Sequence, residues 1–148
     1  DAAKLALDSG KAAEIFSRMV SALGGPADFV EHPAKYLAPA PIVMPVKALH
    51  DGFVSAIATR DIGLAVVSLG GGRTRPQDAV DHAVGMTGLM PIGAQLKRGD
   101  PICLVHARSM DQVDSAAASI RAAYHLAAAK PARTDPVIRR IESKTPTA

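Results

Sequence analysis

Apolar and polar positions divide this chain into an amphipathic helical start and a longer second part in which short apolar runs alternate with turns. Residues 2–7 have helical spacing and stop at Asp8-Ser9-Gly10. Residues 11–23 form a clearer helical pattern that stops at Gly24-Gly25-Pro26. The apolar face of this second helix comprises Ala12, Ile15, Phe16, Met19, Val20 and Leu23. Because this part of the chain has no sheet to cover, we expect the face to pack on a neighbouring domain.

A proline-rich connector follows, with Pro33, Pro39, Pro41 and Pro45 inside residues 33–45. Proline fixes φ and disfavours helix at the residue before it, so we expect an extended segment and a domain boundary here. After it, residues 42–49 and 53–58 have strand patterns. The sequence His50-Asp51-Gly52 between them predicts the turn of a β-hairpin.

The apolar run at residues 61–69 is long enough for a buried helix or a buried strand. We favour a helix, because Asp61 can cap its start and Gly70 can end it. The remaining elements are expected as strands at residues 84–92 and 101–106 around a tight turn, a helix at 113–130 and a final strand at 136–141. Asp111 is the expected N-cap of that helix and Pro131 closes it. The second part is therefore predicted to be a compact α+β unit.

Composition narrows the class of protein. The 148 residues suffice for one well-buried domain, or a small domain with an attached helical piece. With 48% hydrophobic and 21% charged residues the chain should fold, and with 3% aromatic residues its core must be aliphatic. The net charge is +3, but the positive residues are scattered and densest at residues 133–144, which we expect to be a solvated surface tail. No nucleic-acid partner is therefore expected.

The single cysteine and the histidines point away from redox or metal chemistry. Cys103 excludes an internal disulfide, and its apolar neighbours predict a buried, unreactive thiol in a reducing, cytoplasmic location. No metal spacing occurs among His32, His50, His82, His106 and His125. Asp81-His82 suggests an acid–base pair, but adjacent side chains point apart, so we expect solvated or core-edge histidines.

Targeting and membrane signals are also missing from the pattern. No run approaches the roughly 20 apolar residues that span a membrane, so no membrane partner is expected. The first residues lack the layout of a signal peptide. From this start and from the unpartnered helices, we expect the chain to be cut from a longer one.

Three separated segments resemble the thymidine and pyrimidine nucleoside phosphorylases. GKAAEIFSRMVSALGGPADFVE (residues 10–31) resembles the stretch that closes their central α/β domain. GFVSAIATRDIGLAVVSLGGGRTRPQDAVDHAVGM (residues 52–86) resembles the start of their C-terminal domain, and IGAQLKRGDPICLVHA (residues 92–107) continues it. The resemblance runs in the family's order from Gly10 to about Ile141.

The resemblance implies an α+β C-terminal domain with a β-hammerhead, preceded by two helices of the α/β domain. Residues 1–32 would end that α/β domain, residues 33–45 would be the connector, and residues 46–148 the C-terminal domain. The parent would be a cytoplasmic homodimer that converts thymidine and phosphate to thymine and 2-deoxyribose 1-phosphate as its domains close. Its phosphate-binding and base-recognising residues lie upstream, so no catalytic or cofactor-binding residue is carried over to this chain. The fragment is therefore expected to have a structural and domain-closure role and no activity of its own.

Gly70, Gly71, Gly72 and Arg73, which we call the glycine loop, form the candidate site. One interpretation is an anion-binding nest, or a wall that meets the active-site cleft. The other is a helix C-cap and tight turn with Arg73 paired to a carboxylate such as Asp78. Because these glycines follow a helix, its negative end faces the loop, which favours the structural interpretation. Arg73 should then be held by a carboxylate or face the preceding domain.

Two other functions stay open from the sequence. One is a free-standing hammerhead module that binds a small anion, and the other is the C-terminal domain of a nucleoside-monophosphate phosphorylase. A loose similarity to biotinyl and lipoyl carriers places the hairpin tip at Ile92-Gly93-Ala94, but Lys97 lies beside Arg98 in a turn, which disfavours a carrier. A self-contained module would bury Ile15, Phe16, Met19 and Val20 within this chain, whereas a missing domain would leave them exposed.

Overall fold

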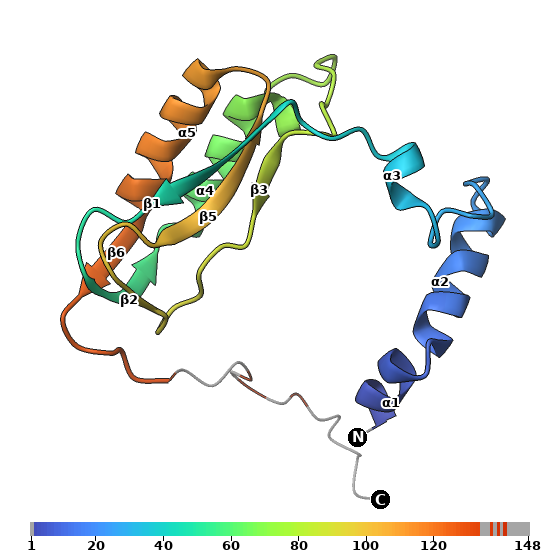
Figure 1. Ribbon diagram of the computed structural model, residues 1–148, viewed down its shortest axis with the longest axis horizontal. Coiled ribbons are helices and arrows are strands. Elements are labelled where there is room, and N and C mark those ends of the chain that lie inside the picture. The colour runs from blue at the N-terminus through green and yellow to red at the C-terminus, as the bar shows by residue number, and fades with distance from the viewer. Residues whose placement is uncertain (1, 134–136, 138, 140, 142–148) are drawn as a thin grey trace, which may run out of the picture.

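The computed structural model describes residues 2–133, 137, 139 and 141. In chain order its elements are α1 (Ala2–Asp8), α2 (Lys11–Ala22), α3 (Pro33–Tyr36), β1 (Ile42–Lys47), β2 (Gly52–Ile57), α4 (Thr59–Val66), the π-helical turn η1 (Val67–Gly71), β3 (Gly85–Thr87), β4 (Gln95–Leu96), β5 (Pro101–Ala107), α5 (Met110–Ala123) and β6 (Tyr124–Ala127). The predicted mixed α+β class is confirmed (Figure 1). Within these described residues no helix is long and apolar enough to cross a bilayer.

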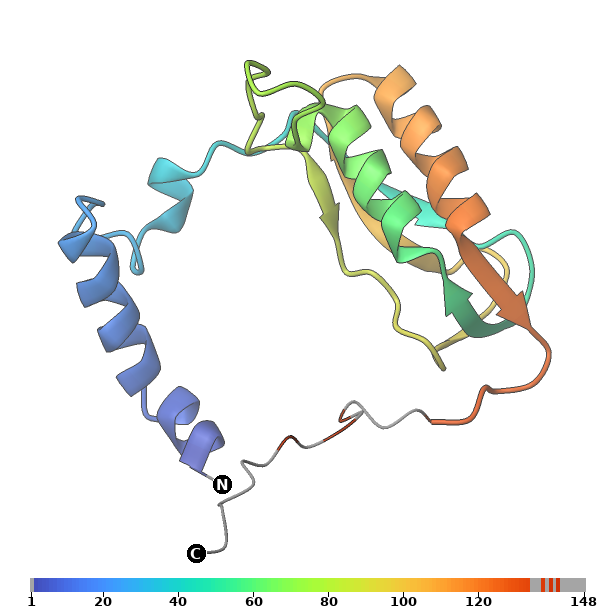
Figure 2. The ribbon, with the colours of Figure 1, turned by 180° about the vertical axis from the view of Figure 1, so that it is seen from behind.

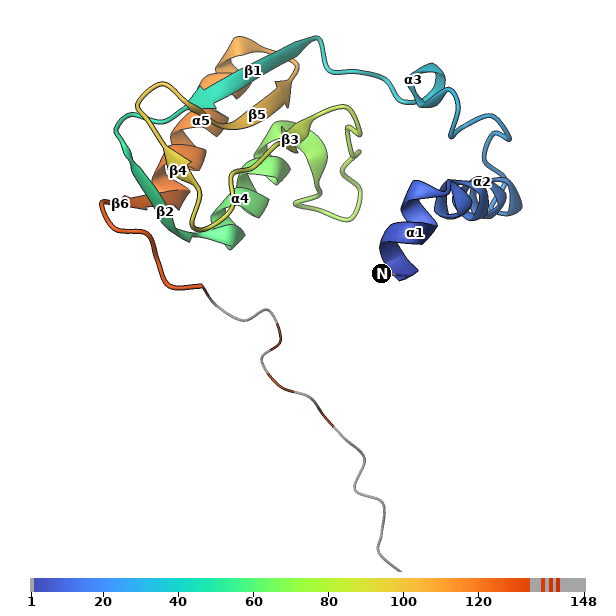
Figure 3. The same cartoon turned by 60° about the horizontal axis from the view of Figure 1, so that its bottom comes forward.

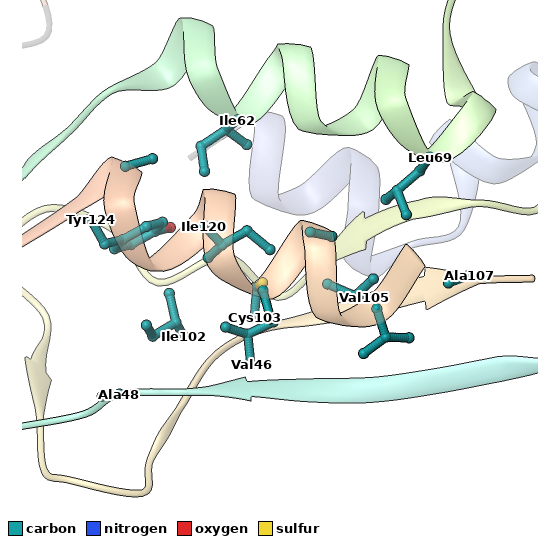
Figure 4. Packing of buried hydrophobic residues seen from close by; sticks show 14 of the residues in the cluster. Val46, Ala48, Ile62, Leu69, Ile102, Cys103, Val105, Ala107, Ile120 and Tyr124 are labelled. Atoms are coloured by element: carbon teal, nitrogen blue, oxygen red, sulfur yellow. The ribbon is translucent and has the colours of Figure 1, made fainter. Parts of the chain in front are cut away.

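Two small antiparallel sheets form the α+β unit, with strand orders β1-β5-β3 and β4-β2-β6. Helix α5 packs against β5 and β1 of the first sheet, and α4 lies beside α5, as Figures 1 and 2 show from opposite sides. The core lies between α5 and the strands β1 and β5 (Figure 4). Paired Val46 and Cys103 both lie in it and are nearly fully buried.

The sequence of α5 explains how closely it approaches the sheet. Its buried positions are Val113, Ala116, Ala117, Ile120 and Ala123. This is the spacing of one helix face, and its alanines are small enough to let the helix backbone come near the strands. Ile120 has no exposed surface, and Figure 4 shows it above Cys103. The predicted burial of Cys103 is confirmed, and this burial raises the pKa of its thiol to about 11, which disfavours the reactive thiolate.

The predicted hairpin between β1 and β2 is wrong, although both strands exist. Within the described residues β1 pairs with β5, and β2 pairs with β4 and β6. The turn at Asp51 is occupied by a distant segment, because its carboxylate accepts a hydrogen bond from the backbone N–H of Arg98 at 2.7 Å. Ala48 is likewise bonded to the backbone of Gly99 and Asp100. This segment takes the place of a partner strand and directs β2 into the second sheet.

Two further predictions of element length need correction, one at the last helix and one in the middle of the chain. The predicted helix at residues 113–130 ends at Ala123, and the next four residues form β6, in which Leu126 pairs with Val54. The strand expected at residues 84–92 is reduced to β3. The strand expected at residues 136–141 lies largely outside the described residues.

The helix predicted at residues 61–69 is confirmed as α4 and η1, but its cap is not Asp61. The N-cap is Ala58, and Asp61 lies in the first turn. For α5 the N-cap is Ser109, whose side chain accepts from the backbone N–H of Gln112 at 3.3 Å. Asp111 therefore lies inside the first turn, where a carboxylate interacts favourably with the helix dipole.

The first three helices form an N-terminal arm that lies apart from the sheets in all three ribbon views (Figures 1, 2 and 3). The connector was expected to be extended, but Pro33 takes the first position of the one-turn helix α3, where proline is well suited. The arm has its own small cluster, in which Phe29 contacts the rings of Phe16 and Tyr36. Asp28 accepts hydrogen bonds from the Tyr36 hydroxyl and from Lys35.

Candidate functional site

The glycine loop leaves the C-terminal end of α4 through the π-helical turn η1. Gly70 has φ 94°, a left-handed conformation that favours glycine. A Cβ on Gly71 would lie 2.9 Å from Cγ1 of Val66, and one on Gly72 would lie 2.7 Å from Cγ2 of Val67. Both distances are shorter than packed carbon atoms allow. All three glycines therefore have a structural reason at this corner.

Carbonyl groups of the last helical turn are satisfied by two distant segments. The Gly70 carbonyl accepts from the backbone N–H of Asp81 at 2.9 Å. The Leu69 carbonyl accepts from Nε2 of Gln112 at 3.3 Å. These contacts fix the start of the glycine loop to Asp81 and to α5.

Asp81 is bound by the guanidinium of Arg108 in a two-point contact, with Nε 2.7 Å from Oδ2 and Nη2 2.9 Å from Oδ1. The backbone N–H of Ala83 donates to the same carboxylate at 3.0 Å. The hydrogen bonds from Arg108, followed by that from Ala83, lower the pKa of Asp81 to about 2. Asp81 is therefore ionised and occupied near neutral pH, and it is a poor general base for a pair with His82.

The expected partner of Arg73 has another role. Asp78 accepts hydrogen bonds from the hydroxyl of Thr74 at 2.6 Å and from the backbone N–H groups of Thr74 and Arg75 at 3.1 and 2.8 Å. The Thr74 hydroxyl is the main cause of the lowered pKa of Asp78. Among the described residues no carboxylate forms an ion pair with Arg73, so the expected Arg73–Asp78 pair is wrong.

Beside the loop, a shallow groove of about 280 Å³ is lined by residues 82–87 and His106. The hydroxyl of Thr87 lies 2.9 Å from Nε2 of His106. His106 is half-buried near the end of the central strand β5, and His82 is exposed, in keeping with the predicted solvated or core-edge histidines. In the part of the chain that the structure describes, no group of three or more His, Cys, Asp or Glu residues is placed to hold a metal ion. The remaining histidines, His32, His50 and His125, are exposed and lie on separate elements.

The sequence located the glycine loop but missed Arg108 and Gln112, which hold it. One signal for them was available. Residues 109–112 read S-M-D-Q, which fits the S-x-x-Q form of a capping box with Ser109 as cap. That pattern would have placed Gln112 in the first turn, although its bond to Leu69 depends on the tertiary fold.

Comparison with known proteins shows which family this chain resembles in sequence. Residues 53–127 match the pyrimidine nucleoside phosphorylase C-terminal domain. Thymidine phosphorylase from Mesorhizobium japonicum is 59% identical over 135 residues, which are 91% of this chain and 31% of that protein. Thymidine phosphorylases from Agrobacterium fabrum and Sinorhizobium medicae are 47% and 45% identical over 94% of this chain. The chain spans about a third of the length of these curated relatives. It belongs to the pyrimidine nucleoside phosphorylase family, of which it represents the C-terminal part.

Proposed function

We propose that this chain is the C-terminal third of a thymidine phosphorylase, which converts thymidine and inorganic phosphate to thymine and 2-deoxyribose 1-phosphate. The observation that carries the proposal is 59% identity across nearly the whole chain to a thymidine phosphorylase that is about three times longer. Phosphate and the nucleoside would bind to the preceding part of the parent. The family resemblance also leads us to expect a cytoplasmic homodimer.

The N-terminal arm supports the view that a domain is missing. No residue of α2 is buried in this described stretch, and its apolar face is open to solvent, with Ile15, Phe16 and Met19 each about half exposed. Solvation of such a continuous apolar stripe is unfavourable. We therefore assign residues 1–32 to the end of a preceding α/β domain and residues 33–45 to the connector. Residues 46–148 are then the C-terminal domain, for which a β-hammerhead remains our expectation.

The same proposal gives the glycine loop a place in the enzyme. Gly70, Gly71, Gly72 and Arg73 would form part of the wall that faces the active-site cleft and moves as the domains close. The support is the exposed Arg73, which has no ion-pair partner among the described residues while its neighbours are held in place. A free cation at the cleft would favour anionic substrates there.

The test compares this chain alone with a chimera, in which the preceding two-thirds of the Mesorhizobium japonicum relative is joined to it. Thymine release from thymidine and phosphate is followed by ultraviolet absorbance. We expect no phosphorolysis by the chain alone and phosphorolysis by the chimera, with no release without phosphate. Activity of the isolated chain would contradict its role as a supporting domain. A folded chimera that cleaves thymidine monophosphate but not thymidine would instead favour a nucleoside-monophosphate phosphorylase.

A further inference from the structure

Four contacts around the glycine loop close into a ring of hydrogen bonds. The Gly70 carbonyl accepts from the Asp81 backbone, and the Asp81 carboxylate is bound by Arg108. The backbone N–H of Arg108 donates to Oε1 of Gln112 at 2.8 Å. Nε2 of Gln112 then donates to the carbonyl of Leu69, which is covalently next to Gly70. The ring joins the end of α4, the segment before β3 and the corner between β5 and α5, three regions that are distant in sequence.

The ring lies at the base of an excursion of the chain. Gly70 and Asp81 are its two ends, and the 2.9 Å bond between their backbones closes it like an Ω-loop. Within the excursion, Asp78 holds Thr74 and Arg75 through three hydrogen bonds. Hydrogen bonds thus organise both the base and the tip of this excursion, and Arg73 lies between them with an exposed side chain.

We infer that this ring is a positioning device, in which Asp81, Arg108 and Gln112 hold both ends of the excursion from Gly70 to Asp81 so that Arg73 is presented to the domain that precedes this chain. The inference rests on the proposed function, because it places the loop at the cleft of that same enzyme. It adds three residues that touch no substrate and act through the loop.

Positioning and simple stability have different kinetic signatures. With the ring opened, only the fraction of molecules whose loop is in place binds substrate well, and the apparent KM rises by the inverse of that fraction. A variant that only unfolds part of the sample lowers kcat at an unchanged KM, because the remaining molecules are native. A rise in KM for phosphate at nearly constant kcat is therefore the expected result.

Whether the ring holds the glycine loop is tested first on this chain alone, in a proteolysis assay that does not depend on enzymatic activity. Between Gly70 and Asp81 trypsin has a single good site, the Arg73–Thr74 bond, because Arg75 precedes Pro76 and that bond resists cleavage. The rate of cleavage reports how often the loop opens from its base.

Arg108→Gln and Asp81→Asn each remove the two-point contact. We expect both variants to be cleaved after Arg73 about fivefold faster, while the midpoint of urea unfolding, which reports global unfolding, falls only slightly. Arg108→Lys keeps the positive charge but not the two-point geometry of the guanidinium. Its cleavage rate should therefore lie between those of the unmodified chain and Arg108→Gln. The matched control is Arg121→Gln, which loses a guanidinium bonded to the carbonyl of Lys47 at the other end of α5. Equal cleavage of the unmodified chain and Arg108→Gln would overturn the ring as the element that holds the loop.

The role in catalysis is tested in the chimera with the same variants. Arg108→Gln should raise KM for phosphate about fivefold with kcat within twofold, and Arg121→Gln should leave both unchanged. Faster cleavage with an unchanged KM would show that the ring holds the loop but does not serve the site, which overturns the inference. Loss of kcat alone would assign the ring to stability and overturn it as well. An unmodified chimera that is folded but inactive would contradict the proposed function, and with it the catalytic role, while the cleavage result on loop holding would stand.

Discussion

The N-terminal arm and the α+β unit contain similar apolar residues and use them in opposite ways. In the α+β unit, α5 buries a complete face against β1 and β5. In the arm, α2 has an equally regular apolar face, yet none of its residues is buried. The large apolar side chains that the arm leaves exposed include Leu5, Leu7, Ile15, Phe16, Met19 and Leu23. Periodicity therefore tells which face of a helix is apolar, but only the structure tells whether a partner for that face is present.

The arm is nevertheless organised locally. Lys35 and Tyr36 tie α3 to Asp28 in the segment that follows α2, and the ring of Phe29 contacts Phe16 of α2 and Tyr36 of α3. These are exposed polar contacts and ring edges, which hold a local shape but contribute little free energy of folding. The comparison thus separates a unit stabilised by its own core from an arm whose apolar face is left exposed by the described residues.

The largest expected effect comes from making the same change in both regions. Ile120→Ala should lower the free energy of unfolding by about 2–5 kcal/mol, because Ile120 is fully buried and leaves a cavity. Ile15→Ala in the isolated chain should change it by less than about 0.5 kcal/mol, since Ile15 is about half exposed and alanine favours helix. Urea unfolding of both variants measures the difference.

The same two variants, Ile15→Ala and Ile120→Ala, also test in the chimera whether the apolar face of α2 has a partner. With a preceding domain to cover α2, Ile15→Ala should become destabilising by about 2 kcal/mol or more, approaching the core substitution. A cost that stays near zero in a folded, active chimera would mean that the apolar face of α2 does not contact that domain.

How far the sequence could predict these regions depends on the range of the interactions. The faces of α2 and α4 follow from neighbours three and four residues apart, and both helices were predicted. Strand β6 was missed because Leu126 owes its conformation to Val54, and local pattern alone suggested continued helix. The hairpin was wrong for a similar reason, since the turn at Asp51 is bonded to Arg98.

The candidate site shows the same division. The glycines were recognisable from their position after an apolar run, and the closeness of Gly71 to Val66 gives a local reason for them. The residues that hold the glycine loop could not be recognised from the sequence, because Asp81 and Arg108 are 27 residues apart and meet only in the folded chain. The incorrect pairing of Arg73 with Asp78 came from sequence proximity, whereas the carboxylate is already used by Thr74.

A smaller effect is expected from two glycines of the same helical segment. Gly71→Ala should destabilise the chain by about 1–3 kcal/mol, because the new Cβ would lie 2.9 Å from Val66 Cγ1 and 3.2 Å from the Val66 carbonyl. Gly63 lies inside α4 with nothing within 4 Å of its Cβ position. Gly63→Ala should therefore stabilise by about 0.5–1 kcal/mol through higher helix propensity. Thermal unfolding of the two variants tests whether close packing, not turn formation alone, requires glycine in the loop.

The smallest expected effect is a pH dependence of the free energy of unfolding that arises at Asp81, beside the glycine loop. The pKa of Asp81 lies at about 2 in the folded chain, below its ordinary value of 3.8. Protons therefore bind the unfolded chain first as the pH falls, so the contribution of Asp81 is fully present above about pH 4 and is lost toward about pH 2. Asp78 also has a lowered pKa, so its protonation adds to the loss of stability at low pH. Only a comparison of Asp81→Asn with the unmodified chain therefore isolates the contribution of Asp81. Urea midpoints should fall less steeply between these pH values for Asp81→Asn than for the unmodified chain, because the variant has no carboxylate to protonate at this position. Parallel pH profiles would mean that the Asp81–Arg108 contact does not stabilise the folded chain.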